Sequence, residues 1–515
     1  MFLESLLVHK LPLEILSTIF SIATHLSDDP VSAISVPLSI SHVCARWRKV
    51  SLSTGSLWTR LALFFPAIDP AQLTRTICWL NRSKSYPLEI LLDLRYSDWD
   101  WPSSGDGHPF TGEMLQVLLT ILLPHVQRWK TFEMLTDTWE PIHTFLTRIR
   151  DTPNLKAPML QSLALSRCNA YFVRKGEVFQ PIELKEPIPL ISTGMEAEGL
   201  RDVLLAGVHV DWTKSRCFRN LLDLTLKFHS ADVMPSFPEF KNMLDACPDL
   251  ESLTILGWGP SLDPNSDENS TSQTKRELLL RLPTLKRFSH GFVDVDYAVD
   301  FLALFRLPSL RALELQDITA NLNEDPSIGL DATPVLEWLI SNGAQLSDFP
   351  SIWYPLCQVE RLELEGIKTS QQVFSRFLRA FTSLKKLCLS DVDSNLLSAL
   401  YARQDEETVP SLPGPIVVEG RERRRSSFAS VSLTPAPLLT CPHLVDMVCR
   451  RVDYKYLSKI ISARCKVDSG VKPLETLEID SGGEGSEGSS FALREEDREA
   501  FLKAGVGLLV NGEAR

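Results

Sequence analysis

The stretch LRALEL at residues 310–315 shows most clearly the pattern that decides the fold of this chain. In an extended strand, alternate side chains point to opposite faces, so Leu313 and Leu315 share one face while Glu314 points to the other. The same pattern, L-x-x-L-x-L with some aliphatic replacements, recurs along the chain, and each copy predicts one strand with one buried face. Clear copies begin at Leu160, Leu200, Leu221, Leu250, Leu310, Val359, Leu384 and Leu474, and degenerate copies begin at Val126, Leu285 and Leu444.

Stretches with helical periodicity separate the copies, for example Phe237 to Cys247, Arg276 to Leu282 and Val373 to Phe381. A single unit of strand, turn and helix cannot bury its apolar face alone, whereas stacked units bury a continuous core. We therefore expect an α/β solenoid with a curved parallel sheet. Because the copies are unevenly spaced, we expect the solenoid to be irregular and to contain insertions.

The strand residues that alternate with the buried leucines form a row on the opposite face of the expected sheet. Broad concave faces of this kind commonly bind other proteins, and the alternative is a solvated face without a ligand. The candidate binding residues, which carry charges of both signs, are Thr254, Glu314, Arg361, Glu363, Lys386 and Glu478. Trp212, Trp258 and Trp353 lie near strand ends and are either interface anchors or core residues.

The sequence contains no recognisable catalytic or cofactor-binding motif. The patterns G-x-x-x-x-G-K-[ST], H-E-x-x-H and G-x-S-x-G are absent. A literal G-x-G-x-x-G at residues 483–488 includes Glu484 and Glu487, which would repel a pyrophosphate. No C-x-x-C pair occurs among the ten cysteines, and Cys441 with His443 lacks a second pair of metal ligands. We therefore expect no enzyme activity, no catalytic residue, no cofactor and no bound metal.

The composition is that of a folded, acidic chain of 515 residues, 44% apolar and 23% charged. The formal net charge of -12 provides no positive field for the backbone of a nucleic acid. No apolar run approaches the roughly 18 residues that a membrane span requires. Scattered cysteines fit reduced thiols. We expect a soluble protein of the cytoplasm, the nucleus or both, without nucleic acid or membrane partners.

The residues before the repeats predict three short helices. The first begins near Pro12, which suits a first helical turn. Its apolar residues recur at three- and four-residue steps and predict one buried stripe, made of Leu13, Leu16, Ile19, Phe20 and Ala23. A loop over Thr24 to Ser39 leads to a second helix over Ile40 to Val50, and a short third piece carries Trp58. So small a unit buries too little surface to be stable alone, so we expect an exposed apolar face for a partner.

The order of the motifs in this module resembles an F-box. Residues 11–20 read LPLEILSTIF, residues 41–50 read SHVCARWRKV and residues 56–58 read SLW. The chain resembles the F-box proteins with irregular leucine-rich repeats that abound in mushroom-forming fungi. This resemblance implies that the helices bind the Skp-type linker subunit of a cullin-RING ubiquitin ligase. The positions that it assigns to this contact and to the core beneath it are Leu11, Pro12, Ile15, Leu16, Ile19, Val43, Cys44, Trp47 and Trp58. The alternative is an ordinary helical hairpin in which all of them are core.

With this resemblance, the sequence predicts an α+β chain of four parts. They are a three-helix F-box at residues 8–62, a connecting helical region at 63–120, an α/β leucine-rich-repeat solenoid with a curved parallel sheet at 121–480, and an acidic Gly/Ser stretch with a C-terminal helix at 481–515. Disordered loops are expected near residues 261–274 and 404–437.

The second expected loop contains the basic cluster RERRR at residues 421–425, directly before Ser426 and Ser427. A basophilic kinase would add negative charge beside these arginines and compact the loop, so both serines are candidate phosphorylation sites. The alternatives are a nuclear localisation signal and a solvated run of charge.

Two functions fit these expectations. In the first, the chain is the substrate-recognition adaptor of an SCF-type cullin-RING E3 ubiquitin ligase, and its partners are a Skp-type linker, through it cullin and RING subunits, and a protein substrate. In the second, it is a leucine-rich-repeat scaffold that acts outside any ubiquitin ligase. Binding of the linker distinguishes the two. An enzyme with an unrecognised site is a third reading, which a pocket with strongly shifted ionisable groups would support.

Overall fold

The structure is a computed structural model, and its described residues fall into two compact units. The units are Met1–Leu307 with Asn321–Pro326, and Pro308–Ala320 with Ser327–Arg515. The described residues are 11–26, 29–66, 68–99, 107–168, 170–191, 197–262, 279–322, 329–343, 354–401, 439–452, 455–464, 471–480, 499, 505–510 and 513–514. Outside them lie Trp353, Ser426, Ser427, the basic cluster, the acidic Gly/Ser stretch, and the two expected loops except for residues 261 and 262.

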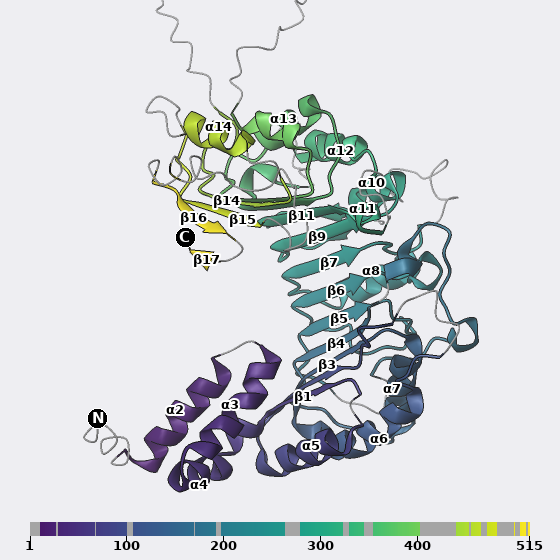
Figure 1. Cartoon of the computed structure of the whole chain (residues 1–515). Helices are drawn as coiled ribbons and strands as arrows, with labels where there is room; N and C mark the ends of the chain where they lie inside the picture. Colours follow the sequence, from purple (N-terminus) through teal and green to yellow (C-terminus); the bar gives the residue numbers. More distant parts are fainter. Residues whose placement is uncertain are drawn as a thin grey trace, which may run out of the picture. The chain divides into compact units, whose positions relative to one another are not determined.

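The described residues begin with helices α2 (Leu13–His25), α3 (Pro30–Val43) and α4 (Ala45–Ser53), which Figure 1 shows, and the 3-10 turn η1 (Gly55–Trp58) follows. The expected loop over Thr24 to Ser39 is wrong, because α3 occupies most of it. Pro30 starts α3, at a position where a missing N–H loses no intrahelical bond. The expected second helix is divided at Cys44, whose extended backbone separates α3 from α4. Its Sγ accepts a hydrogen bond from the Trp47 N–H at 3.4 Å and so caps α4.

Eight strands of the first unit form a parallel sheet in which neighbours follow the order of the chain. These strands are β1 (Arg60–Phe64), β2 (Leu88–Asp93), β3 (Trp129–Thr136), β4 (Ser162–Arg167), β5 (Asp202–Ala206), β6 (Asp223–Lys227), β7 (Ser252–Leu256) and β9 (Arg287–Phe292). Two further short strands, β8 (Leu280–Arg281) and β10 (Phe305–Arg306), pair with each other, so the expected helix over Arg276 to Leu282 is wrong at its described end.

Helices of the first unit pack on the apolar side of these strands. They are α5 (Pro70–Arg82), α6 (Gly112–Leu122), α7 (Trp139–Asp151), α8 (Phe237–Asp245) and α10 (Val295–Ala303). Figure 1 shows α7 and α8 on one side of the strands. The predicted helix at 237–247 is confirmed as α8, which begins with a capping box between Ser236 and Glu239. A row of buried side chains runs along successive strands on this side, made of Met134, Leu165, Leu205, Leu226, Ile255 and His290.

The expected helical connection at residues 63–120 is wrong in part. It contains the whole of β2, and the sheet begins with β1 rather than after residue 120. Neither strand follows the L-x-x-L-x-L phrase. In β2, however, Leu88, Ile90 and Leu92 alternate with more exposed residues, which is the pattern of a strand with one buried face.

The second unit repeats the arrangement of strand and helix. Its parallel strands in chain order are β11 (Ala312–Asp317), β12 (Arg361–Glu365), β13 (Lys386–Ser390), β14 (Asp446–Arg450), β15 (Thr476–Asp480) and β16 (Gly507–Val510), followed by the antiparallel β17 (Glu513–Ala514). Its helices are α12 (Thr333–Gly343), α13 (Gln371–Arg379) and α14 (Lys455–Arg464), and the short α11 (Thr319–Leu322) crosses the boundary between the units in the sequence. The predicted helix at 373–381 is confirmed as α13.

The expected C-terminal helix is wrong over residues 507–510 and 513–514. These residues form β16 and β17, because Leu508 is buried in register with Leu477 of β15. Pairing with an available sheet edge therefore outweighs the helix preference of two adjacent leucines.

Two buried charged residues hold loops of the second unit. Asp317, at the end of β11, accepts hydrogen bonds from the backbone N–H groups of Thr319 at 2.9 Å and Leu330 at 2.7 Å. The guanidinium of Arg464 donates to the carbonyl oxygens of Thr440 at 3.1 Å and Cys441 at 2.7 Å. Both side chains fix irregular backbone whose polar groups would otherwise be buried without partners.

Candidate functional site

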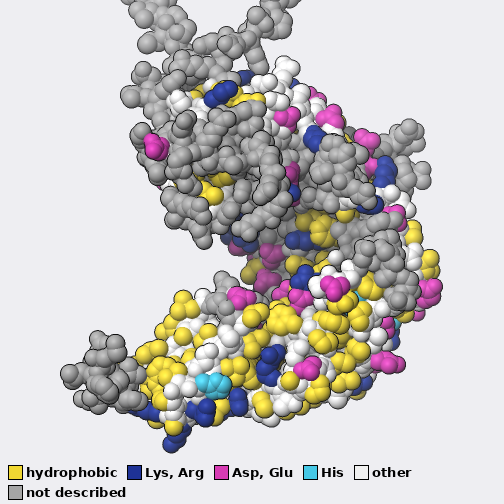
Figure 2. Space-filling view, in the orientation of Figure 1, with side chains coloured by type: hydrophobic (Ala, Val, Ile, Leu, Met, Phe, Trp, Pro, Cys, Tyr) yellow, Lys and Arg dark blue, Asp and Glu magenta, His cyan; other side chains and the backbone are white. Residues whose placement is uncertain are grey.

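Helix α2 carries two apolar stripes on different sides. Leu16 and Phe20 face inward and are almost fully buried. The second stripe, which we name the α2 face, lies outward at helical spacing and consists of Ile15, Ile19, Ile22 and Leu26. Its side chains are 46% to 75% exposed, the highest value being that of Leu26. Figure 2 shows hydrophobic side chains gathered over the N-terminal helices. The expectation of one buried stripe is therefore wrong for Leu13 and Ile19, whereas an exposed apolar face is present.

The nine residues assigned to linker binding by resemblance divide into three groups. Leu16 and Trp58 are buried in the core. Leu11, Cys44 and Trp47 are half-buried, and the Trp47 ring lies 4.8 Å from the Phe20 ring between centroids. The exposed residues are Pro12, Ile15, Ile19 and Val43. Sequence reasoning missed Ile22 and Leu26, which continue the exposed stripe by one more turn.

Trp58 connects the N-terminal helices to the repeats of the first unit. Its ring is fully buried, and its Nε1–H donates to the Ser51 carbonyl oxygen at 2.9 Å. It meets the Trp79 ring of α5 edge to face at 4.6 Å, and the Arg82 guanidinium lies 4.5 Å from its centroid. The strand β1 follows after Thr59 alone and pairs with β2. The helical module is thus packed against the first repeats.

The candidate binding row on the strands lies mainly in the second unit. Glu314, Arg361, Glu363, Lys386 and Glu478 lie on β11, β12, β13 and β15, on the side opposite to the buried leucines. Glu363 Oε2 is 2.9 Å from Arg361 Nη2. The sixth residue of the row, Thr254, lies on β7 of the first unit, which is described separately. Substrate binding by this row stays a prediction.

The tryptophans near strand ends serve the core in the described residues. Trp212 is buried and donates to the Val233 carbonyl oxygen at 2.7 Å. Trp258 is half-buried and donates to the Val173 carbonyl oxygen at 2.8 Å. Of the two readings of these residues, core filling describes Trp212 and Trp258 better than an interface anchor.

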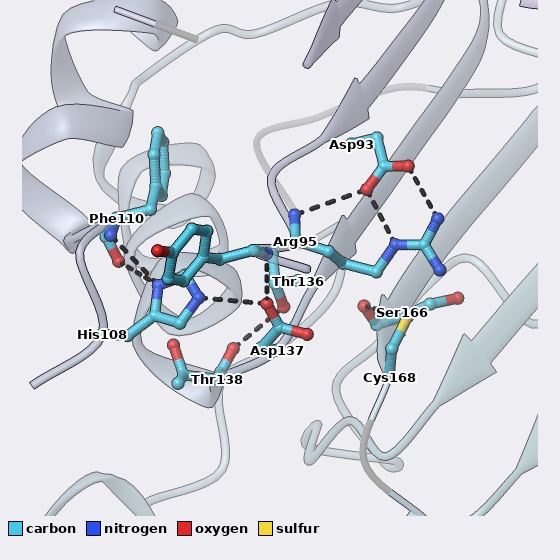
Figure 3. Close-up of polar contacts among 10 residues, drawn as sticks. Asp93, Arg95, His108, Phe110, Thr136, Asp137, Thr138, Ser166 and Cys168 are labelled. Atoms are coloured by element: carbon cyan, nitrogen blue, oxygen red, sulfur yellow. Dashed lines mark hydrogen bonds and ion pairs between the residues drawn. The ribbon is translucent and has the colours of Figure 1, made fainter. Parts of the chain in front are cut away.

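A polar cluster that the sequence did not predict joins the carboxyl ends of β2, β3 and β4 (Figure 3). The Arg95 guanidinium binds the Asp93 carboxylate with two bonds of 2.8 and 2.7 Å. Although burial opposes it, Arg95 keeps the pKa of the Asp93 carboxyl below its ordinary value. Cys168, which follows β4, lies near the same guanidinium. Cys168 is exposed as a residue, but partial desolvation of its sulfur and the nearby carboxylates raise the pKa of the thiol, and Arg95 acts in the opposite direction.

The other half of the cluster is the pair of His108 and Asp137, whose Nε2 and Oδ2 atoms are 3.0 Å apart. His108 Nδ1 lies 3.0 Å from the Phe110 backbone nitrogen, which donates to it, and 3.1 Å from the Phe110 carbonyl oxygen. The Tyr96 N–H donates to the Asp137 carboxylate at 2.7 Å. Both ring nitrogens are engaged, so His108 cannot serve as a base for Cys168. The cluster holds three loops together and offers no catalytic arrangement.

Two further findings concern the described part of the chain alone. There, no group of three histidine, cysteine, aspartate or glutamate side chains is arranged to hold a metal ion. Within the same residues, every helix is too short or too polar to cross a membrane.

No protein-family model and no curated protein matches the sequence. Among solved structures, the chain resembles one described as "Crystal structure of Rad7 and Elc1 complex in yeast". The two are 12% identical, the match covers 97% of this chain and 93% of that chain, and the TM-score is 0.33. A TM-score of this size does not establish a shared fold, so the likeness supports no statement about function.

Proposed function

We propose that this chain is the substrate-recognition adaptor of an SCF-type cullin-RING E3 ubiquitin ligase. In this proposal, helices α2 to α4 bind a Skp-type linker protein, and the repeats bind a protein substrate. The adaptor itself makes and breaks no bond. It contributes proximity, because it raises the effective concentration of substrate lysines near the conjugating enzyme.

The α2 face is the observation that carries the proposal. Four large aliphatic side chains, Ile15, Ile19, Ile22 and Leu26, are about half exposed or more on one side of a single helix. Full burial of such a side chain contributes about 1.5–3 kcal/mol, so leaving four of them in water favours association with an apolar partner. Ile15 and Ile19, two of the positions that the resemblance to an F-box assigns to linker binding, lie on this face.

Rigid attachment of the helices to the repeats suits an adaptor. A bound substrate is presented at a fixed position only if the linker-binding module does not swing freely. Trp58 packs between Ser51, Trp79 and Arg82, so it joins the helices to α5 of the first repeats. This packing supports the adaptor reading over that of a scaffold with an independent N-terminal module.

Co-purification with a recombinant Skp-type linker and cullin tests the proposal. The wild type is expected to retain both proteins, and the double variant Ile19→Glu with Ile22→Glu is expected to lose at least about 90% of the linker, since charges replace apolar contacts. The matched control is Ile77→Glu on α5, whose side chain is 46% exposed and lies outside the α2 face. Circular dichroism verifies that all three remain folded.

The outcomes separate two functions. Retention by the wild type and Ile77→Glu, with loss by the double variant, supports the ligase adaptor. If the folded wild type captures no linker, a repeat scaffold acting outside any ubiquitin ligase replaces it. If the double variant captures as much linker as the wild type, the α2 face is not the linker-binding surface.

A further inference from the structure

An open cleft of about 730 Å³ lies at the amino ends of β1 to β4 in the first unit. It is bordered by residues just before, or at the first two positions of, four successive strands, and His25 at the end of α2 adds a further wall. It is therefore distinct from the α2 face and from the polar cluster at the opposite ends of the strands. Its volume falls within the range of about 300–1,000 Å³ that is typical of ligand sites.

The floor of the cleft is a group of three charges with an excess of positive charge. The Glu89 carboxylate accepts hydrogen bonds from Arg60 Nε at 3.0 Å and from Lys130 Nζ at 2.9 Å. Although burial opposes them, Lys130 and Arg60 hold the pKa of the Glu89 carboxyl below its ordinary value, so the carboxylate is ionised at neutral pH. Two cations thus face one anion in a chain whose net charge is -12. The Lys130 side chain is still 40% exposed and has donors to spare.

A β-bulge brings Lys130 to this position. The pairing of β2 with β3 passes from Leu88 opposite Trp129 to Glu89 opposite Thr131, so Lys130 is an additional residue on its strand. A bulge of this kind redirects a side chain, and bulges occur preferentially beside functional sites. Lys130 is therefore both the additional residue of the bulge and one of the two cations of the cleft.

The walls of the cleft expose large apolar side chains. Tyr86 is 46% exposed and Met159 is 44% exposed, and each is adjacent to a proline that also borders the cleft, Pro87 and Pro158. Tyrosine and methionine are favoured at protein interfaces, where methionine adapts its shape to the partner. The prolines restrict the backbone of both walls, which lowers the entropy lost on binding.

We propose that this cleft binds an extended peptide segment of a protein partner, in which an acidic side chain is flanked by apolar ones. The carboxylate of the segment pairs with Lys130, and its apolar neighbours pack on Tyr86 and Met159. The commitment to an acidic segment follows from charge complementarity with the excess cation. Only the identification of the partner as the ligase substrate rests on the proposed function. Peptide binding itself needs no linker.

A phage-displayed library of random twelve-residue peptides, panned against the full chain, tests this inference. Enriched peptides are expected to share an aspartate or glutamate with apolar residues on both sides. One enriched peptide, synthesised with a fluorophore, is then titrated by fluorescence anisotropy. Lys130→Met is expected to weaken its binding by about tenfold, as loss of a hydrogen bond to a charged group does, and Met159→Asp is expected to do the same. The matched control is Lys241→Glu on α8, a half-buried lysine that pairs with Asp245 and lies outside the cleft.

Three results would overturn the inference: no enrichment, enrichment of basic peptides, or peptide binding that Lys130→Met and Met159→Asp leave unchanged. Linker co-purification on the same variants separates this outcome from failure of the adaptor proposal. If the wild type captures the linker but binds no peptide, the cleft proposal fails and the adaptor proposal stands. Both cleft variants leave the α2 face intact, so they are expected to keep linker capture while peptide binding weakens.

Discussion

Replacement of His290 with leucine is expected to stabilise the first unit. On the neighbouring strands, aliphatic residues such as Leu226 and Ile255 fill the position that His290 occupies on β9. The ring is fully buried and lies 4.9 Å from the Phe301 ring between centroids. Nδ1 is 3.3 Å from the Ile255 carbonyl oxygen, whereas Nε2 meets no hydrogen-bond partner among the described residues. An unpaired buried polar atom costs about 1–3 kcal/mol, and the lost Nδ1 bond offsets part of the gain.

A lower pH is expected to increase the difference in free energy of unfolding between the wild type and His290→Leu. Burial lowers the pKa of His290 from 6.5 to about 4. As the pH falls below about 6.5, His290 becomes protonated in the unfolded chain. In the folded chain it stays neutral until the pH approaches 4. The folded state therefore loses stability between pH 6.5 and pH 4. Each pH unit in this window costs about 1.4 kcal/mol. We expect His290→Leu to be more stable than the wild type by about 1 kcal/mol at pH 7.5 and about 3 kcal/mol at pH 5.

Urea unfolding followed by tryptophan fluorescence at pH 7.5 and pH 5 measures both quantities. The control variant is His42→Gln, because His42 is an exposed histidine on α3. It should leave the pH dependence unchanged. The reasoning is refuted if the difference between His290→Leu and wild type is the same at both pH values, or if the leucine variant is the less stable protein at pH 5.

Three further predictions concern other buried or clustered groups. Asp317→Ala is expected to lower the free energy of unfolding of the second unit by about 2–4 kcal/mol, because the backbone N–H groups of Thr319 and Leu330 lose their buried acceptor. Asp317→Asn should lower it by less in the same urea unfolding, since one acceptor oxygen remains. Arg464→Lys is expected to be nearly as destabilising as Arg464→Leu in the same assay, because a single ammonium cannot span the two carbonyl oxygens. Cys168 should react with iodoacetamide at pH 7.5 more slowly than in the unfolded chain, since the pKa of its thiol is raised. Asp93→Asn should accelerate that reaction, because Arg95 is then free to stabilise the thiolate. Mass spectrometry measures both rates.

Much of the repeat architecture could be predicted from the sequence, because the six-residue phrase L-x-x-L-x-L is enough to identify one strand and its buried face. All eight clear copies of L-x-x-L-x-L are strands whose fourth and sixth residues are buried. The degenerate copy at Val126 is a strand with a different register, because the bulge at Lys130 moves the buried positions to Phe132 and Met134. A pattern of fixed spacing cannot reveal an inserted residue.

The N-terminal module was harder to predict because helical spacing alone does not distinguish the two sides of α2. Residues three and four apart fit a buried stripe through Leu16 and Phe20, and they fit equally an exposed stripe through Ile15 and Ile19. Only tertiary packing decides which stripe is buried, and Phe20 of the buried stripe packs on the Trp47 ring of α4. Helix α3 was missed because Pro30 and Pro37 are typical of loops, although a first-turn proline is compatible with a helix.

The polar cluster and the cleft could not be predicted from the sequence. Asp93, His108, Asp137 and Cys168 come from separate repeats, and no local pattern connects them. Parallel stacking brings the carboxyl ends of β2, β3 and β4 together and so assembles the cluster. The cleft depends in the same way on the amino ends of four strands. Both are properties of the register, which the sequence leaves undetermined between repeats.

Hydrogen exchange of the full chain with and without a purified Skp-type linker tests most directly whether the α2 face binds the linker. We expect the linker to slow exchange in α2 and in the part of α3 that ends at Val43, with no change in β11 to β15 of the second unit. Unchanged exchange throughout α2 at saturating linker, or protection confined to the repeats, would contradict the assignment of the α2 face as the linker-binding surface.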